Sequence, residues 1–268
     1  MSLLLQLLTG GREGRLSQYL GKDSQQYIDL LLQAEADFFQ LHQPKYDYLI
    51  FKMQLVSRLS AKQLQLLPEY QVGDKQIVLV DDHNMQQVID NLNQANILGF
   101  DTETRASFEK GRQYPISLIQ LADVNVCYLF QIEQLSDLSL LADILNNDKI
   151  TKVGIGLRQD QYQLQRDLAI SLRAGFDLQW LMQQLGGAKQ LGTKAIVSQV
   201  LQCTLAKSKQ LSLSNWQAIP LTNEQQLYAA LDGFVARECF MALIAQLKPY
   251  QASMEPAILR RLGCFFED

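Results

Sequence analysis

Residues 97–104 read ILGFDTET, and this stretch decides both the fold and the chemistry expected of the 268-residue chain. The apolar run from Ile97 to Asp101 predicts a buried strand. Side chains at positions i and i+2 of a strand point to the same face, so Asp101 and Glu103 converge at its end. Two adjacent anions with no cation between them raise each other's pKa. The pair is either half of a Mg²⁺ or Mn²⁺ site, for which carboxylate oxygens are suitable ligands, or a chance acidic strand end.

Two later segments bring further acidic side chains. Residues 222–225 have the form of a capping box and open a long helix. Tyr228 and Asp232 are four residues apart in that helix, so they share one of its faces. Residues 152–156 predict a short strand that ends in glycines, and Asp160 follows as another helix begins. Three separate elements therefore each deliver a carboxylate.

Asp101-x-Glu103, the segment 153–156 followed by Asp160, and Tyr228-x-x-x-Asp232 resemble the three motifs of the DEDDy 3′–5′ exonucleases. That family includes ribonuclease D and the Werner-type exonuclease domain. The resemblance extends over roughly residues 75–248, and three ordered motifs on the expected element types are more specific than any one of them. Further stretches also resemble the family in its own order: residues 117–121, 207–208, 214–216, 220–221, 226 and 228–230.

The resemblance implies metal-dependent hydrolysis of DNA or RNA from a free 3′ end, with two divalent cations, Mg²⁺ or Mn²⁺, and release of 5′-mononucleotides. Asp101 would bridge both cations. Glu103 and Asp232 would complete the cation site on the side of the nucleophile, and Asp160 would hold the second cation. Tyr228 would orient the attacking water, because a phenol with an ordinary pKa of about 10 is a poor base at neutral pH.

The candidate nucleic-acid contacts are Thr102, Arg105, Lys207 and Trp216, with Lys110, Arg112 and Lys209 as basic neighbours. The basic side chains could contact phosphates or simply be solvated surface charges. Trp216 could stack on a base. A tryptophan in a loop that leads into a helix is nevertheless more often a packing residue.

Composition is that of a globular protein, with 47% hydrophobic and 19% charged residues. The net charge of −4 argues against a non-specific DNA packager coated in basic groups. The two histidines lie outside the motifs, and the four cysteines form no C-x-x-C pair, which disfavours a zinc site or a disulfide framework. Residues 1–8 make a poor signal peptide, and no apolar stretch is long enough for a membrane span. We therefore expect no membrane association and a reducing, cytoplasmic setting.

The patterning predicts three parts: an all-helical segment over residues 1–72, an exonuclease domain over 73–248 and a C-terminal tail over 249–268. Apolar residues recur at helical spacing in the first part, with an interruption at Pro44. The second part predicts an α/β arrangement of helices around a mixed sheet, and the resemblance implies the ribonuclease H-like topology. Strands are expected at 77–80, 97–101, 116–122, 126–130, 152–156 and 174–176, with helices at 85–93 and 135–145.

Two smaller predictions and two alternatives complete the interpretation. Asp177 precedes a helical stretch and is expected to be its N-cap. Gly233, inside the last helix, would be explained by close packing against the sheet. A catalytically silent ribonuclease H-like module that binds nucleic acid or a partner protein is the main alternative, although such modules usually lose an acid and here all four stand in place. The histidine-type exonuclease subgroup is disfavoured because Leu227 occupies the position of its base.

Overall fold

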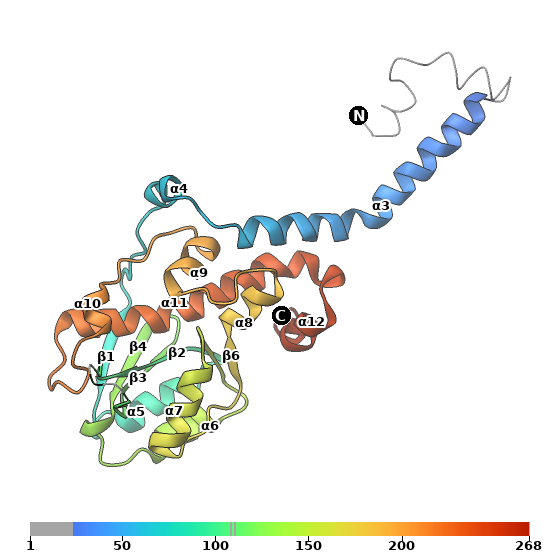
Figure 1. Ribbon diagram of the computed structural model, residues 1–268. Helices are drawn as coiled ribbons and strands as arrows, with labels where there is room; N and C mark the ends of the chain where they lie inside the picture. The colour runs from blue at the N-terminus through green and yellow to red at the C-terminus, as the bar shows by residue number, and fades with distance from the viewer. Residues whose placement is uncertain (1–23, 108, 110, 268) are drawn as a thin grey trace.

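The computed structural model describes residues 24–107, 109 and 111–267, and Figure 1 shows how their helices and strands are arranged. Its centre is a six-stranded mixed sheet with the order β1-β4-β3-β2-β5-β6. Strand β3 pairs antiparallel with β2 and β4, whereas the other neighbours pair parallel. The strands are β1 (Gln76–Val80), β2 (Ile97–Thr104), β3 (Ile116–Ala122), β4 (Val126–Gln131), β5 (Thr151–Gly154) and β6 (Gly175–Asp177). All six predicted strands are present, with ends that differ by no more than three residues.

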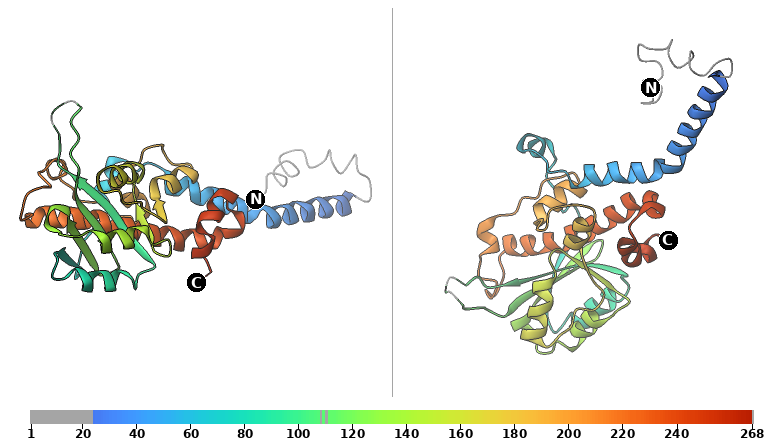
Figure 2. Two further views of the ribbon diagram at one scale, coloured as in Figure 1. Left: turned by 90° about the horizontal axis from the view of Figure 1, so that it is seen from below. Right: turned by 45° about the vertical axis from the view of Figure 1, so that its right-hand side comes forward.

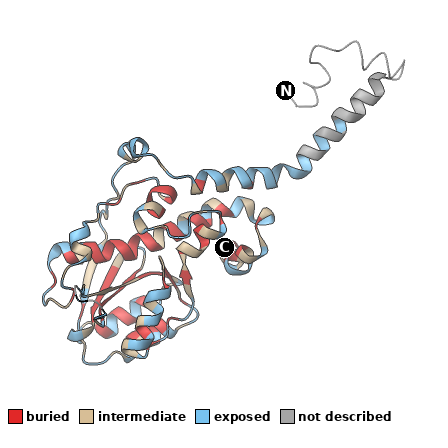
Figure 3. Cartoon of the chain, viewed as in Figure 1, coloured by how far each residue is buried: buried red, intermediate tan, exposed pale blue. Residues whose placement is uncertain are grey.

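Helices cover both faces of the sheet, and strand β2 shows how the sequence divides between them. Leu98 and Phe100 pack into a core with three helices on one face: α5 (Met85–Leu92), α6 (Ser139–Asn146) and α7 (Arg158–Leu168). The alternate residue Gly99 faces α11 (Asn223–Leu247) on the other face. Helices α8 (Leu178–Gln184) and α9 (Thr193–Val200) share a core with α11 on that face. Figure 2 shows α11 crossing the sheet, and Figure 3 shows that it is buried over most of its length.

The close approach of α11 to β2 depends on two glycines. A Cβ atom added to Gly99 would lie 1.8 Å from the carbonyl oxygen of Gly233, so no larger residue fits there. A Cβ atom added to Gly233 would lie 3.0 Å from that of Ala122. The predicted close packing of Gly233 against the sheet is therefore confirmed, and it brings the middle of α11 onto the strand that carries Asp101.

The start of α11 agrees with the sequence prediction, whereas the start of α6 does not. The predicted capping box is present, with Thr222 accepting from the Gln225 backbone and Gln225 accepting from the Thr222 backbone. The helix expected over residues 135–145 begins at Ser139, because the chain first forms a short 3₁₀ turn, η2 (Ile132–Gln134), and then runs extended at Leu135.

The N-terminal region is a long helix, α3 (Ser24–Val56), followed by the short α4 (Ala61–Leu66). The expected interruption at Pro44 was wrong, because α3 continues through it. A proline lacks the N–H and crowds the preceding turn, which bends a helix without necessarily ending it, and Figure 1 shows α3 bending. The apolar side chains that recur at helical spacing before Pro44 lie mostly outside the described ones. Tyr48 and Leu55 are buried against the rest of the protein, whereas Tyr46 and Met53 are exposed.

Residues after α11 pack back onto the same core. They form η3 (Lys248–Ser253), α12 (Pro256–Leu262) and η4 (Gly263–Phe265). Met254, Ile258 and Leu262 are buried in the core that α8, α9 and α11 share. In the described part of the chain no helix is both long and apolar enough to cross a bilayer.

Candidate active site

Three carboxylates from two elements meet where α11 crosses β2. One oxygen from each of Asp101, Glu103 and Asp232 lies within 4.8 Å of the others. Asp101 and Glu103 point to the same face of β2 because they are two residues apart, as the strand period requires. Asp232 is next to Gly233, whose contact with the sheet brings the helix down to the strand. The packing of α11 thus assembles the cluster from residues 130 positions apart.

The surroundings of these carboxyl groups disfavour their ionised forms. Burial is the largest cause that raises the pKa of Asp101, and repulsion by Asp232, Asp160 and Glu103 raises it further. Burial and repulsion by Asp232 raise the pKa of Glu103 to about 8. Burial also raises the pKa of Asp232, against the opposing attraction of Lys207. Four acids therefore stand together with less positive charge than their ionised forms need.

Lys207 is the ammonium group that contacts the cluster. Its Nζ forms a salt bridge with Asp232 and lies 3.9 Å from the centroid of the Tyr228 ring. Burial opposes its charged form, but the attraction and hydrogen bond of Asp232 outweigh burial, so the pKa of Lys207 is raised. Burial raises the pKa of Tyr228 despite the nearby ammonium. The phenol therefore keeps its proton at neutral pH, which favours a donor or orienting role over that of a base.

Asp160 lies in the first turn of α7, beside the cluster and outside the group of three converging oxygens. Its Oδ1 accepts a hydrogen bond of 2.5 Å from Thr102 Oγ1 on β2. Burial is the largest cause that raises its pKa, and the Thr102 hydrogen bond partly opposes that. Because Thr102 and Asp101 are neighbours on the strand, this bond ties α7 to the position of the metal-binding candidates.

Asp177 holds the start of α7 in place. Its carboxylate accepts from the backbone N–H groups of Gly156 and Leu157, 2.9 and 3.1 Å away, which immediately precede the helix. It also accepts from Gln179 and is the N-cap of α8, so the predicted cap is confirmed. Gly156 has a φ of +81°, a conformation that favours glycine. The loop between β5 and α7 is thereby fixed, and with it Asp160.

The predicted nucleic-acid contacts fall into different environments. Thr102 bonds to Asp160, and Lys207 bonds to Asp232. Arg105 is exposed, lies over the Tyr114 ring at 4.9 Å and reaches Gln217 at 3.4 Å. Trp216 is 0% exposed and its ring centroid is 5.8 Å from that of Tyr228, so it packs in the core and presents no free face to a base.

The basic neighbours differ as well. Arg112 pairs with Glu109 at 3.1 Å on the surface. Lys209 lines a hollow beside Tyr228, together with Lys207 and Lys194. Lys110 lies outside the described residues. The lysines therefore gather beside the carboxylate cluster.

One buried group beside the cluster was not predicted from the sequence. Gln120 on β3 pairs in register with Asp101 on β2, so their side chains are cross-strand neighbours. Gln120 is 0% exposed, and neither its Nε2 nor its Oε1 has a hydrogen-bond partner among the described residues. A glutamine near the middle of the largely apolar run of residues 116–122 is a signal that could have identified it. Unpaired buried amides are costly and therefore rare.

The donor set fits a hard divalent cation. Carboxylate oxygens are the ligands that Mg²⁺ and Mn²⁺ prefer. The raised pKa values show a deficit of positive charge, and the orphaned amide of Gln120 shows a deficit of polar partners. Asp101, Glu103 and Asp232 could hold such a cation directly, with Asp160 at its edge.

Comparisons with known proteins agree with this geometry. A family model described as a 3′-5′ exonuclease matches residues 77–248. The chain is 34% identical over 146 residues to the bifunctional 3′-5′ exonuclease/ATP-dependent helicase WRN of Mus musculus, covering 53% of this chain and 10% of that protein. It is 30% identical over 149 residues to a 3′-5′ exonuclease of Arabidopsis thaliana, covering 54% of this chain and 52% of that protein. The chain thus spans between a tenth and about half of these relatives.

A solved structure supports the fold. The Trypanosoma brucei RNase D complex with RNA U12 has a TM-score of 0.60 and 18% identity, covering 73% of this chain and 70% of that one. The likeness confirms the predicted mixed sheet flanked by helices, in the ribonuclease H-like arrangement of ribonuclease D.

Proposed function

The chain belongs to the 3′-5′ exonuclease family, and on that premise we propose that it hydrolyses single nucleotides from the 3′ end of DNA or RNA with the help of divalent cations. The observation that carries the proposal is the convergence of Asp101, Glu103 and Asp232 to within 4.8 Å. The family match alone would also fit a silent module. A silent module would have no need of four acids held together at an energetic cost.

Two divalent cations, Mg²⁺ or Mn²⁺, would supply charge neutralisation at the phosphate and a water with a lowered pKa. In the proposed arrangement Asp101, Glu103 and Asp232 would hold the cation that activates the attacking water, and Asp101 and Asp160 would hold the other. The 2.5 Å bond from Thr102 keeps Asp160 on the β2 side of its helix. The cation ligands would thus come from one strand, β2, and two helices, α7 and α11.

Tyr228 acts through its protonated hydroxyl. Burial raises its pKa, so the phenolate that would have to accept a proton is scarcely populated at neutral pH. The hydroxyl instead orients the attacking water beside Asp232, four residues along the same helical face. Its ring is held from behind by the buried Trp216. Trp216 therefore contributes to substrate binding by positioning Tyr228 and not by stacking on a base.

The substrate class rests on the family and on the lysines beside the site. Lys194, Lys207 and Lys209 line the hollow next to Tyr228, where a polyanionic strand would bind. The relatives include an exonuclease/helicase and an RNase D bound to RNA, so both nucleic acids are proposed as substrates.

The test is a cleavage ladder. The full chain is incubated with 5′-labelled and 3′-labelled single-stranded DNA and RNA in Mg²⁺, Mn²⁺, Ca²⁺ or EDTA. We expect 5′-labelled strands to shorten one nucleotide at a time in Mg²⁺ or Mn²⁺. Cleavage should be much slower in Ca²⁺, whose looser coordination does not hold the reacting groups as closely. Full activity in EDTA, or loss of mononucleotides first from the 5′ end, would refute the proposal.

A further inference from the structure

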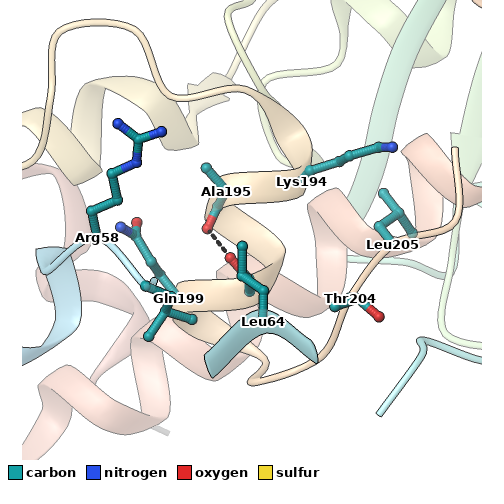
Figure 4. A pocket seen from close by; sticks show the side chains of 9 residues that line it. Arg58, Leu64, Lys194, Ala195, Gln199, Thr204 and Leu205 are labelled. Carbon is teal, nitrogen blue, oxygen red and sulfur yellow. Dashed lines mark hydrogen bonds between the residues drawn. The ribbon is translucent and has the colours of Figure 1, made fainter. Parts of the chain in front are cut away.

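A pocket of about 300 Å³ lies between the N-terminal region and α9, outside the carboxylate cluster. The segment from Arg58 to Leu64 forms one wall, and Lys194 and Gln199 of α9 lie on the other. Figure 4 shows this arrangement, with Arg58 and Lys194 extending on opposite sides of the opening. Residues 58–64 precede the part of the chain that the family model matches, whereas the α9 wall of the pocket lies within it.

The pocket is apolar inside and basic at its edges. Leu59, Leu64 and Leu205 contribute aliphatic surface, and Arg58 and Lys194 are exposed cations. No acidic residue lines it, although the chain as a whole carries a net charge of −4. Among the described residues Arg58 has no salt-bridge partner, and Lys194 Nζ donates only to the backbone oxygen of Lys207, at 2.8 Å. An anion with an apolar portion matches this combination.

Gln199 adds an unpaired hydrogen-bond acceptor. It is 7% exposed, and its Nε2 donates to the backbone oxygens of Val56 and Ser57 at 3.4 and 3.3 Å. Those two bonds fix which way the amide faces, because a flipped amide would set its oxygen against two carbonyls. The remaining Oε1 is buried and has no donor in the part of the chain that the structure describes. An unpaired buried acceptor is costly, and a rotation of the amide toward the pocket would let a ligand N–H supply the missing partner.

The pocket shares one lining residue, Lys194, with the hollow beside the carboxylate cluster. Lys194 also lines the hollow of about 380 Å³ that contains Lys207, Lys209 and Tyr228. A row of basic side chains therefore leads from Asp232, which Lys207 contacts, past Lys194 to Arg58. A strand whose 3′ end lies at the carboxylates would meet this row with its upstream phosphates.

We propose that the pocket between α4 and α9 binds an upstream nucleotide of the substrate strand, with its base against Leu59, Leu64 and Gln199 and its two flanking phosphates at Arg58 and Lys194. The proposal rests on the proposed exonuclease function. Every base presents an N–H donor on its Watson–Crick edge, so the Gln199 acceptor serves strands of any sequence. The volume is at the lower end of the usual range for small-ligand pockets, roughly 300–1,000 Å³, which suits one base and not a stack of bases. The N-terminal region thus extends the substrate site beyond the family domain.

The experiment measures binding against strand length. Labelled single strands of increasing length, from a dinucleotide upward, are titrated with the full chain in EDTA, and anisotropy gives the dissociation constants. The variants are Arg58→Glu, which reverses the charge at the opening, and Ala195→Phe, which fills the pocket from the α9 side. Lys62→Glu is the matched control, because Lys62 is an exposed cation of the same region that does not line the pocket.

We expect Arg58→Glu and Ala195→Phe to weaken binding of longer strands by about tenfold, the effect of roughly 1.4 kcal/mol. Binding of the dinucleotide should not change. The shortest strand whose binding the variants weaken gives the number of nucleotides between the carboxylate cluster and the pocket. Arg58→Glu should also lower the salt dependence of binding by about one phosphate contact. Lys62→Glu should match the wild type at every length.

Three results would overturn the inference: no strand binds the wild type, Arg58→Glu binds all lengths normally, or Lys62→Glu weakens binding as much as Arg58→Glu. If free AMP weakened binding of longer strands to the wild type but not to Arg58→Glu, the pocket would be a mononucleotide site, and this result would also overturn the inference. The proposed function is tested separately by cleavage of a short strand in Mg²⁺. A wild type that cleaves but shows no Arg58 effect contradicts this inference alone, and one that cleaves nothing contradicts the exonuclease proposal.

Discussion

Two places where carboxylates are at least partly buried treat their charge in opposite ways. Where α3 meets α12, Glu255 accepts from Tyr48 Oη at 2.7 Å and pairs with Lys52. Burial opposes its ionised form, but the hydrogen bonds from Lys52 and Tyr48 outweigh burial, so the pKa of Glu255 is lowered. One carboxylate there has two donors from this chain.

At the sheet the number of carboxylates exceeds the number of positively charged partners. Four carboxylates share the ammonium of Lys207, and the pKa of each is raised, with burial the largest cause. The difference teaches that a structural acid is paired within the fold, whereas these acids are left short of positive charge. A cation from solution is the economical remedy, and the proposed function identifies it as a divalent metal.

The largest effect should come from removing the acid at the centre of the cluster. Asp101→Ala should reduce release of mononucleotides by roughly a thousandfold or more, because a bound cation supplies several kcal/mol of charge stabilisation and each factor of ten corresponds to about 1.4 kcal/mol. Thermal unfolding of the metal-free variant should be unchanged or shifted upward, because repulsion is relieved.

Glu255→Ala is the contrasting variant from the other region. It should keep full cleavage and lose about 1 kcal/mol of stability or less, since its ion pair is partly exposed. Metal-dependent cleavage by Asp101→Ala at nearly the wild-type rate would remove the distinction between the two regions.

Removing one hydroxyl from the site should have a smaller effect. Tyr228→Phe keeps the ring that packs on Trp216 but loses the group that orients water. We expect a rate roughly tenfold to a hundredfold lower, at or below the range of general acid–base contributions, with unchanged Mn²⁺ affinity. A pH–rate profile separates the roles. If the wild-type rate rose with the ionisation of a phenol and the variant lacked that rise, Tyr228 would be a base.

The two regions also predict opposite pH dependence of stability. Glu103 has a folded pKa of about 8 against an ordinary value of 4.5, so between these pH values the folded protein binds more protons than the unfolded chain. The free energy of unfolding of the metal-free protein should therefore fall as pH rises through that window. Glu255, whose pKa is lowered, has the opposite effect on stability. The stabilisation that its ionised form contributes is lost only as pH falls through its folded pKa.

Thermal melts in EDTA between pH 5 and pH 8.5 measure this balance. We expect the melting temperature to decline over the range, to decline less in Asp101→Asn, and to recover in Mg²⁺ at the high-pH end. A melting temperature that rose with pH in EDTA would mean that the cluster is already compensated by the chain.

The smallest effect concerns the ammonium that occupies the cluster. Because Lys207 pairs with Asp232, a divalent cation must compete with it. Lys207→Met, which removes the charge and keeps much of the volume, should bind Mn²⁺ a few-fold more tightly at pH 8.5. Lys209→Met, an exposed neighbour, should bind as the wild type does. Weaker binding by Lys207→Met would show that the ammonium supports the metal site.

Local periodicity explains why part of this structure could be predicted from sequence. The strand period of two places Asp101 and Glu103 on one face, and the helical spacing of four relates Tyr228 to Asp232. The N-cap at Asp177 and the capping box at residues 222–225 are likewise local signals. Each depends on neighbours within a few residues, so the sequence pattern alone is sufficient.

Features that depend on distant contacts could not be predicted in this way. The pairing of β1 with β4 joins segments about 50 residues apart, and no local signal specifies it. The register that sets Gln120 against Asp101 and the salt bridge between Lys207 and Asp232 exist only in the assembled fold. The pocket between α4 and α9 likewise requires the N-terminal region to be placed on the exonuclease domain.

Calorimetric titration with Mn²⁺ at pH 8 tests most directly whether the cluster lacks a cation that solution must supply. The wild type and Glu255→Ala should bind Mn²⁺ with the same affinity and with release of protons, since acids with raised pKa values ionise on binding. Asp101→Ala should bind at least about tenfold more weakly, a loss of roughly 1.4 kcal/mol. The account would be contradicted by a wild type that binds no Mn²⁺ at millimolar concentration, or by an Asp101→Ala variant that binds it equally well.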